Sequence, residues 1–195
     1  PSIETYANIK NNKYSFSRLI NRYKKANLPS HQIINLKKNK LSKQSWISSD
    51  TVDKVKEHLK LGNQILFFIN RRGFAPYVLC KNCLKVFSCP NCSINLVYHK
   101  NKKNLLCHYC GFKSLLNRKC EKKKLCEFIF SGLGVERVLD EAKLLFPNEK
   151  ISIFSSDTMN RASSKKTLEK ILKGEINILI GTQIISKGFH FPNLN

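Results

Sequence analysis

Residues 127–180 read EFIFSGLGVERVLDEAKLLFPNEKISIFSSDTMNRASSKKTLEKILKGEINILI. Apolar runs at 127–130, 151–154 and 176–180 predict three strands. Between these strands, apolar residues at helical spacing predict one helix after the first strand and another after the second. Strands that alternate with helices of this length are typical of a parallel sheet with helical crossovers. We therefore expect an α/β fold.

The same alternation begins upstream of this stretch. A helix is predicted with Ser49 or Asp50 as its N-cap and with its end at Gly62. The apolar run at 64–70 then predicts a strand that is buried on both faces. Residues 1–48 are polar and rich in lysine, and we interpret them as a connector.

Regular patterning stops between these two α/β segments. All eight cysteines lie in this interval, between positions 80 and 126. We therefore predict a partial parallel-sheet lobe, formed by residues 49–73 and 127–195, which an irregular cysteine module at residues 74–126 interrupts.

The spacing of the cysteines favours zinc. Three pairs have two intervening residues and the fourth is looser; the pairs are Cys80 and Cys83, Cys89 and Cys92, Cys107 and Cys110, and Cys120 and Cys126. A tight turn with this two-residue spacing presents two thiolates to one tetrahedral ion. Disulfides, a redox pair and an iron–sulfur cluster are the competing interpretations, but nothing marks the chain as secreted and no pair opens a predicted helix.

The path of the chain favours a nested arrangement of these pairs. Both ends of the insertion must return to the lobe, so its first and last pairs should lie close together. We therefore predict an outer zinc bound by Cys80, Cys83, Cys120 and Cys126, and an inner zinc bound by Cys89, Cys92, Cys107 and Cys110. Sequential pairing is the alternative, and His99 or His108 could replace a thiolate. Four protein ligands at each ion leave no open position, so both metals are expected to be structural.

The chain is strongly basic. Its formal net charge of +22 and its isoelectric point near 9.8 favour a polyanionic partner, although an AT-biased genome also enriches lysine. No Asp or Glu occurs between Glu57 and Glu121, whereas eleven Lys and Arg do. The longest apolar run, at 65–69, is too short to span a bilayer, so no membrane partner is expected. Because the chain begins at Pro1 and has Met159 as its only methionine, we expect it to be a segment of a longer protein.

Three segments, in order, resemble the PriA family of bacterial replication-restart helicases, also called primosomal protein N′. They are QILFFINRRGFAP at 64–76, the cysteine module with CHYCG at 107–111, and ILIGTQIISKGFHFP at 178–192, which is similar to the family's helicase motif V. Shorter matches lie at 1–5, 132–137 and 156–158. The resemblance thus extends over essentially the whole chain.

This resemblance implies part of a RecA-like helicase lobe in a superfamily 2, ATP-dependent 3′–5′ DNA helicase. Such a parent protein would use ATP and magnesium, recognise stalled replication forks, unwind DNA and promote primosome assembly in replication restart. Its partners would be single-stranded or forked DNA, primosome proteins and the replicative helicase, in the bacterial cytoplasm.

Five of the matched residues are candidates for contact with DNA. Arg71 and Arg72 follow the carboxyl end of a predicted strand, where open α/β sheets place their ligands, and can reach phosphate oxygens. Thr182 and Gln183 follow another predicted strand, and Lys187 adds charge nearby. A simple turn is the alternative interpretation for the threonine.

Two departures from the family pattern bear on function. Lys123 stands where the family usually has a cysteine, which puts the outer zinc in question. The chain also lacks a Gly-x-x-x-x-Gly-Lys-[Ser/Thr] phosphate loop, an acidic magnesium box and the arginine-rich motif VI. We therefore expect the chain alone to bind zinc and DNA but not to hydrolyse ATP. The alternative functions are a non-enzymatic zinc module that binds nucleic acid or protein, and a decayed helicase remnant.

Overall fold

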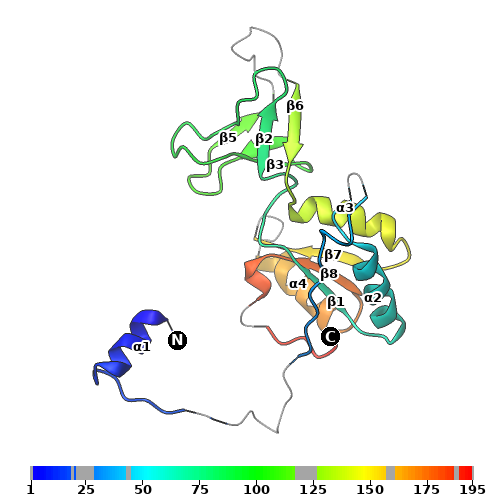
Figure 1. Cartoon of the computed structure of the whole chain (residues 1–195). Coiled ribbons are helices and arrows are strands. Elements are labelled where there is room, and N and C mark those ends of the chain that lie inside the picture. Colours follow the sequence, from blue (N-terminus) through cyan, green and yellow to red (C-terminus); the bar gives the residue numbers. More distant parts are fainter. Residues whose placement is uncertain are drawn as a thin grey trace. The chain divides into compact units, whose positions relative to one another are not determined.

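The computed structural model describes residues 2–18, 20, 29–42, 45–116, 127–156, 161–186 and 189–194, with residues 161–164 described by their backbone only. The chain divides into two compact units, Pro1–Ile34 and Asn35–Asn195 (Figure 1). The first unit contains helix α1, Ile3–Lys10, which Ser2 caps and which buries no residue. The remaining helices and strands of the described residues belong to the second unit.

The core of the second unit is a parallel sheet with the strand order β1-β8-β7, which confirms the predicted α/β fold. The strands are β1 (Ile65–Phe68), β8 (Ile178–Gly181) and β7 (Ile151–Phe154). In the centre, Ile178 of β8 is in register with Ile65 on one side and with Ile151 on the other. All four residues of β8 are buried, as expected for a central parallel strand covered on both faces.

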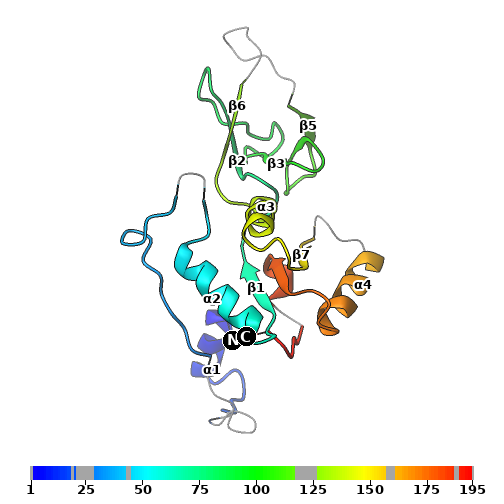
Figure 2. The ribbon, with the colours of Figure 1, turned by 90° about the vertical axis from the view of Figure 1, so that its right-hand side faces the viewer.

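Helices cover both faces of this sheet (Figure 2). They are α2 (Ser49–Lys60), α3 (Val135–Leu145) and α4 (Arg161–Leu172). Val138 of α3 belongs to the same buried cluster as Ile178, whereas Ile171 of α4 packs in a second cluster with Leu179. Neighbouring residues of β8 therefore face opposite layers, as the pleat of a strand requires. Among the described helices, none is long and apolar enough to cross a membrane.

Helix α2 has a different cap from the one predicted. The Ser48 hydroxyl accepts a hydrogen bond from the Thr51 amide at 3.3 Å, so Ser48 is the N-cap. The prediction of Ser49 or Asp50 as the cap is therefore wrong, because both residues already lie inside the helix. At the other end, Gly62 has a φ of 78°, the left-handed conformation that ends the helix as predicted.

Two predicted strands also differ from the structure. The strand expected at 64–70 is the shorter β1, and Phe68 at its end is 47% exposed instead of buried on both faces. The strand expected at 127–130 is β6, Phe128–Ser131, but it pairs antiparallel with β2, Tyr77–Cys80, and does not join the parallel sheet. The chain segment after the last cysteine is thus paired with the segment before the first.

The cysteine module contains short strands where the sequence predicts irregular structure. Beside the β2-β6 pair, a second antiparallel sheet has the order β3-β4-β5, formed by Val97–His99, Asn104–Leu106 and Lys113–Leu115. Strands of three residues are too short to give a periodic pattern in the sequence. Val78, Leu96 and Leu105 form a small core with Cys89 and Cys107. The domain boundaries after residues 48, 73 and 126 stay a prediction.

The chain that leaves β1 crosses the start of α3. The amides of Val135 and Glu136 donate to the carbonyl oxygens of Arg71 and Gly73, at 3.1 and 3.0 Å. Gly134 permits this close approach, because a Cβ atom there would lie 2.1 Å from the Gly73 oxygen. The first turn of α3 therefore fixes the backbone that carries Arg71.

Candidate metal centre and nucleic-acid cleft

The structure brings together the four cysteines predicted for the inner zinc. The sulfur atoms of Cys89, Cys92, Cys107 and Cys110 all lie within 4.8 Å of one another. Cys89 Sγ is 3.8 Å from Cys92 Sγ and 3.5 Å from Cys110 Sγ, and the sulfurs of Cys92 and Cys107 are 3.9 Å apart. Four thiolates at about 2.3 Å from a tetrahedral zinc ion would be about 3.8 Å apart. The donor set and its size therefore fit zinc.

Each of these cysteine pairs sits in a turn, here called a knuckle, that backbone hydrogen bonds fix. In the first knuckle the Cys89 amide donates to the Ile94 oxygen at 2.7 Å, and the Ser93 amide donates to the Cys89 oxygen at 3.1 Å. The equivalent two bonds in the second knuckle, at 107–112, measure 2.8 and 3.0 Å. The residue after the second cysteine has a positive φ in both, 53° at Ser93 and 79° at Gly111. Both knuckles thus present their sulfurs in the same way.

The thiols of the inner group differ in how readily they ionise. The backbone amide of Phe112 is the main cause that lowers the pKa of Cys110 to about 6. The hydrogen bond with Cys110 is the main cause that raises the pKa of Cys92 to about 12, and burial raises the pKa of Cys89. A divalent cation would offset the repulsion between four neighbouring thiolates and so favour their ionised forms.

A third knuckle, at residues 80–85, repeats the same backbone pattern. The Cys80 amide donates to the Lys85 oxygen at 3.0 Å, and the Leu84 amide donates to the Cys80 oxygen at 2.8 Å. Leu84 has a φ of 58°, in the place that Ser93 and Gly111 occupy in the other two knuckles. A positive φ is unfavourable for a leucine, so the backbone hydrogen bonds of the turn must stabilise it.

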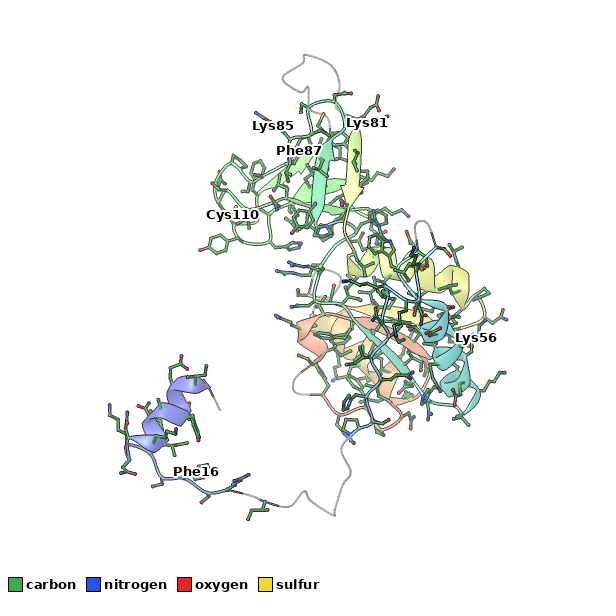
Figure 3. All side chains as sticks on the ribbon, viewed as in Figure 1. Phe16, Lys56, Lys81, Lys85, Phe87 and Cys110 are labelled. Atoms are coloured by element: carbon green, nitrogen blue, oxygen red, sulfur yellow. The ribbon has the colours of Figure 1, made fainter. Side chains whose placement is uncertain are left out.

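The third knuckle is separate from the inner group, and Figure 3 shows its Lys81 at one end of the module and Cys110 on a flank. The Lys81 amide donates to the backbone oxygen of Glu127 at 2.7 Å, and the side chains of the two residues form an ion pair at 2.9 Å. Glu127 directly follows Cys126 in the sequence. Cys120 and Cys126, the other predicted ligands of the outer zinc, lie outside the described residues.

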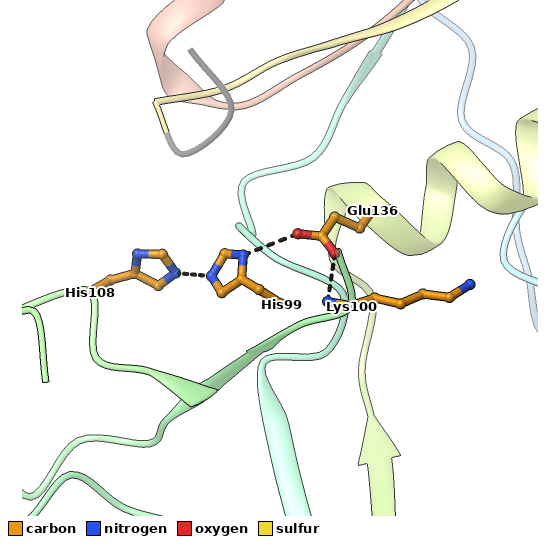
Figure 4. A network of polar contacts seen from close by, with 4 residues as sticks. All are labelled: His99, Lys100, His108 and Glu136. Carbon is orange, nitrogen blue, oxygen red and sulfur yellow. Dashed lines mark hydrogen bonds and ion pairs between the residues drawn. The ribbon is translucent and has the colours of Figure 1, made fainter. Parts of the chain in front are cut away.

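The two histidines considered as alternative ligands contact each other. Their Nε2 atoms are 3.0 Å apart, and His99 Nδ1 lies 3.0 Å from a carboxylate oxygen of Glu136 (Figure 4). Within the described part of the chain, the group of side chains that could hold a metal contains the four thiols and neither ring. The inner ligand set is therefore all sulfur in this geometry.

A cleft of about 650 Å³ lies beside the inner group, between the parallel sheet and the cysteine module. From the lobe it is lined by residues that follow β1, β7 and β8, namely Asn70, Arg71, Arg72, Ser156, Thr182, Gln183 and Ile184. From the module it is lined by Pro76, Tyr77, Ile94, Asn95, Val97 and His108. No described lining residue is acidic, so the cleft is suited to an anionic ligand.

The cleft gathers most of the residues predicted to contact DNA. Four line it, Arg71, Arg72, Thr182 and Gln183, whereas Lys187 lies outside the described residues. Arg71 and Gln183 are exposed, and Arg72 is half-buried with Nη1 3.4 Å from Ser156 Oγ. Thr182 is only 6% exposed, so its side chain offers little surface to a ligand. Contact of these residues with DNA stays a prediction.

Sequence reasoning missed the side of the cleft that the cysteine module supplies. Tyr77, Asn95 and His108 lie on short strands and turns whose sequence has no periodic pattern. Their position depends on how the module packs against the lobe, which no local signal shows. The Asn-Arg-Arg-Gly turn at 70–73 was the available hint, because Tyr77 follows it after only three residues.

The comparisons with known proteins agree with this geometry. Residues 89–114, which contain the inner group, match the family model of the PriA DNA helicase Cys-rich region domain. The chain is 45% identical over 196 residues to the replication restart protein PriA of Rickettsia typhi, 36% over 195 residues to that of Haemophilus influenzae and 30% over 196 residues to that of Bacillus subtilis. Each alignment covers 100% of the chain.

These alignments cover only part of each relative, namely 30% of the Rickettsia protein, 26% of the Haemophilus protein and 24% of the Bacillus protein. The chain therefore spans less than a third of their length. Within that span the similarity includes the Cys-rich region and the lobe on both sides of it. Over its whole length the chain accordingly corresponds to a segment of the PriA replication restart proteins, the one that contains the Cys-rich region.

Proposed function

We propose that this chain is the part of a DNA helicase in which the second motor lobe and a two-zinc module hold a DNA strand between them. The whole protein would be a superfamily 2, ATP-dependent 3′–5′ helicase that recognises stalled forks, unwinds DNA and promotes primosome assembly. ATP and magnesium would bind to the whole protein, which would act with primosome proteins and the replicative helicase in the bacterial cytoplasm. The family and the relatives' name, replication restart protein, support this role.

The observation on which the DNA-binding proposal rests is the cleft at the carboxyl ends of the parallel strands. Open α/β sheets bind their ligands at this edge. Arg71 and Arg72 enter the cleft from the end of β1, and no acidic residue opposes them among the described lining residues. Guanidinium groups pair with phosphate oxygens in a bidentate geometry. Tyr77, 42% exposed on the opposite wall, offers a ring on which a base could stack.

The proposed zinc ions would give the module its rigidity. The inner ion would be held by Cys89, Cys92, Cys107 and Cys110, and the outer ion by Cys80, Cys83, Cys120 and Cys126. The third knuckle and the Lys81–Glu127 contacts next to Cys126 support the outer site. Structural zinc contributes about 10–16 kcal/mol of folding free energy in small peptides. A zinc content of one ion per chain would contradict the outer site.

The DNA contact can be tested by fluorescence anisotropy with a labelled single-stranded oligonucleotide. We expect the Arg71→Ala/Arg72→Ala variant to bind about tenfold more weakly than the wild-type chain, because two phosphate contacts are lost. The dependence of log K on log salt should become shallower by about 1.4 for these two contacts.

A matched control removes the same charge elsewhere. Lys56 and Lys60 lie exposed on α2, away from the cleft. The Lys56→Ala/Lys60→Ala variant should bind DNA with nearly the wild-type affinity and salt dependence. Equal losses in the two double variants would mean that binding follows net charge and not the cleft.

A further inference from the structure

A line of polar contacts joins the second knuckle, at 107–112, to helix α3 (Figure 4). Glu136, in the first turn of α3, has Oε1 3.0 Å from His99 Nδ1, and His99 Nε2 is 3.0 Å from His108 Nε2. His108 stands between Cys107 and Cys110 in the sequence. His99 is 1% exposed and Glu136 is 6% exposed, so water screens their contact little, whereas His108 is half-buried at the wall of the cleft.

The carboxylate of Glu136 determines which atom donates in each hydrogen bond of this line. Its second oxygen, Oε2, accepts from the Lys100 amide at 2.9 Å. A carboxylate can only accept, so His99 must donate from Nδ1. In the neutral ring Nε2 of His99 is then an acceptor, and His108 must donate to it from its own Nε2. The positions of both ring protons therefore depend on the glutamate.

The same turn of α3 also holds the chain at the cleft. The Glu136 amide donates to the Gly73 oxygen and the Val135 amide donates to the Arg71 oxygen. One residue, Glu136, thus contacts the module through its side chain and the Arg71–Gly73 segment through its backbone. Removal of either set of partners would leave a buried polar group unsatisfied, which is unfavourable.

We propose that Glu136 is a positioning residue that couples metal binding at the inner cysteines to the order of the first turn of α3. With the metal bound, the second knuckle fixes the position of His108. His108 then donates a hydrogen bond to His99, and His99 donates one to the Glu136 carboxylate. Loss of the metal frees the knuckle and loosens the turn that fixes Arg71. Because coupling is reciprocal, a disordered turn would in return weaken metal binding. This inference holds whether or not the cleft binds DNA.

The coupling can be measured by hydrogen–deuterium exchange on the whole 195-residue chain, loaded with zinc or treated with a chelator. In the wild-type chain we expect zinc removal to speed exchange of the amides of Val135, Glu136 and Lys100 by about tenfold or more. The first two would lose bonds to backbone oxygens and the third a bond to a carboxylate. Exchange in β7 and β8 should change much less. An unchanged first turn of α3 would overturn the proposal.

The Glu136→Ala variant removes both acceptor oxygens, so the contacts with His99 and with the Lys100 amide are lost. We expect the effect of zinc on the first turn to fall to less than about threefold in this variant, because the turn is already loosened with the metal bound. The control is Asp140→Asn. Asp140 lies on the same helix as Glu136, and the substitution removes its exposed ion pair with Lys100. This control should keep the wild-type response, since exposed pairs contribute little. A wild-type response in Glu136→Ala would overturn the proposal.

A second measurement gives a signature that a packing role would not produce. In the zinc-loaded wild-type chain, ¹⁵N chemical shifts should identify His99 as the tautomer protonated on Nδ1. In Glu136→Gln the amide nitrogen can donate to Nδ1 while the amide oxygen accepts from Lys100, so His99 should change to the tautomer protonated on Nε2. If His99 keeps its Nδ1 proton in this variant, the glutamate does not determine the tautomer of His99, and the proposal fails.

Discussion

At the scale of single residues, Cys107 has two roles at once. Its sulfur belongs to the inner thiol group, and its side chain is fully buried in the small core of the module. We expect Cys107→Ser to lower the zinc content by about one ion per chain, because three ligands do not close a structural site. Metal content measured after dialysis would show this loss. Tyr109→Ala is the control, since Tyr109 lies in the same knuckle but is 83% exposed; a similar loss there would contradict the assignment.

The ionisation of Cys110 predicts how zinc binding depends on pH. Its pKa of about 6 means that it binds a proton below pH 6 and has lost it above. Zinc displaces protons from its ligands, so affinity should fall as the pH falls, and more steeply below pH 6. In a Cys80→Ser/Cys83→Ser variant, which leaves the inner group, proton release on zinc binding should decrease by about one between pH 5 and pH 7.5. Calorimetry in buffers of different ionisation enthalpy would measure this; a constant release would contradict it.

At the scale of secondary-structure elements, the contact between β1's exit and the start of α3 depends on one glycine. Gly134→Ala would place a methyl group against the Gly73 carbonyl, and we expect the free energy of unfolding to fall by about 2–3 kcal/mol. Gly62→Ala is the comparison, because Gly62 has a positive φ of 78° and open space around it. Its loss should be about 1 kcal/mol, from backbone strain alone. Urea denaturation of the two variants would measure the free energy of unfolding of each. Equal decreases in this free energy would argue against a steric role for Gly134.

The elements also show why some predictions succeeded and others did not. Strand β7 has the predicted bounds, because three of its four residues are apolar and its partner in the sheet, β8, is an apolar strand too. The run at 127–130 has similar composition, yet β6 pairs with β2, about fifty residues earlier in the chain. Composition alone does not choose between a parallel and an antiparallel partner at that separation. Glu136 was equally hard to predict, because an acidic residue in the first turn of a helix is common for its effect on the helix dipole.

At the scale of the whole molecule, the cysteine pairs and the parallel sheet followed from sequence because both are repeated, local patterns. The cleft did not, because its two walls come from the lobe and the module and meet only after folding. The Asn-Arg-Arg-Gly turn indicated one wall. The other wall, around Tyr77 and His108, depends on packing between segments without periodicity.

A prediction at this scale concerns ATP. The chain has no phosphate loop and no acidic magnesium box, so we expect no DNA-stimulated ATP hydrolysis by the purified chain, even when it binds DNA. Phosphate release, followed with and without single-stranded DNA, would measure this. Turnover that rises with DNA and disappears in Arg71→Ala/Arg72→Ala would show that this chain is itself a motor.

The pairing of β2 with β6 places the two crossings between lobe and module next to each other. Tyr77 is opposite Ser131 at the first rung of this ladder, and paired residues in antiparallel strands lie about 5 Å apart. Besides the contacts that His99 and Lys100 make with α3, the module is therefore joined to the lobe by one pair of strands, which ends at the Cys80–Phe128 rung. We therefore expect a change in chain length beyond this rung to leave the strands of the parallel sheet in place.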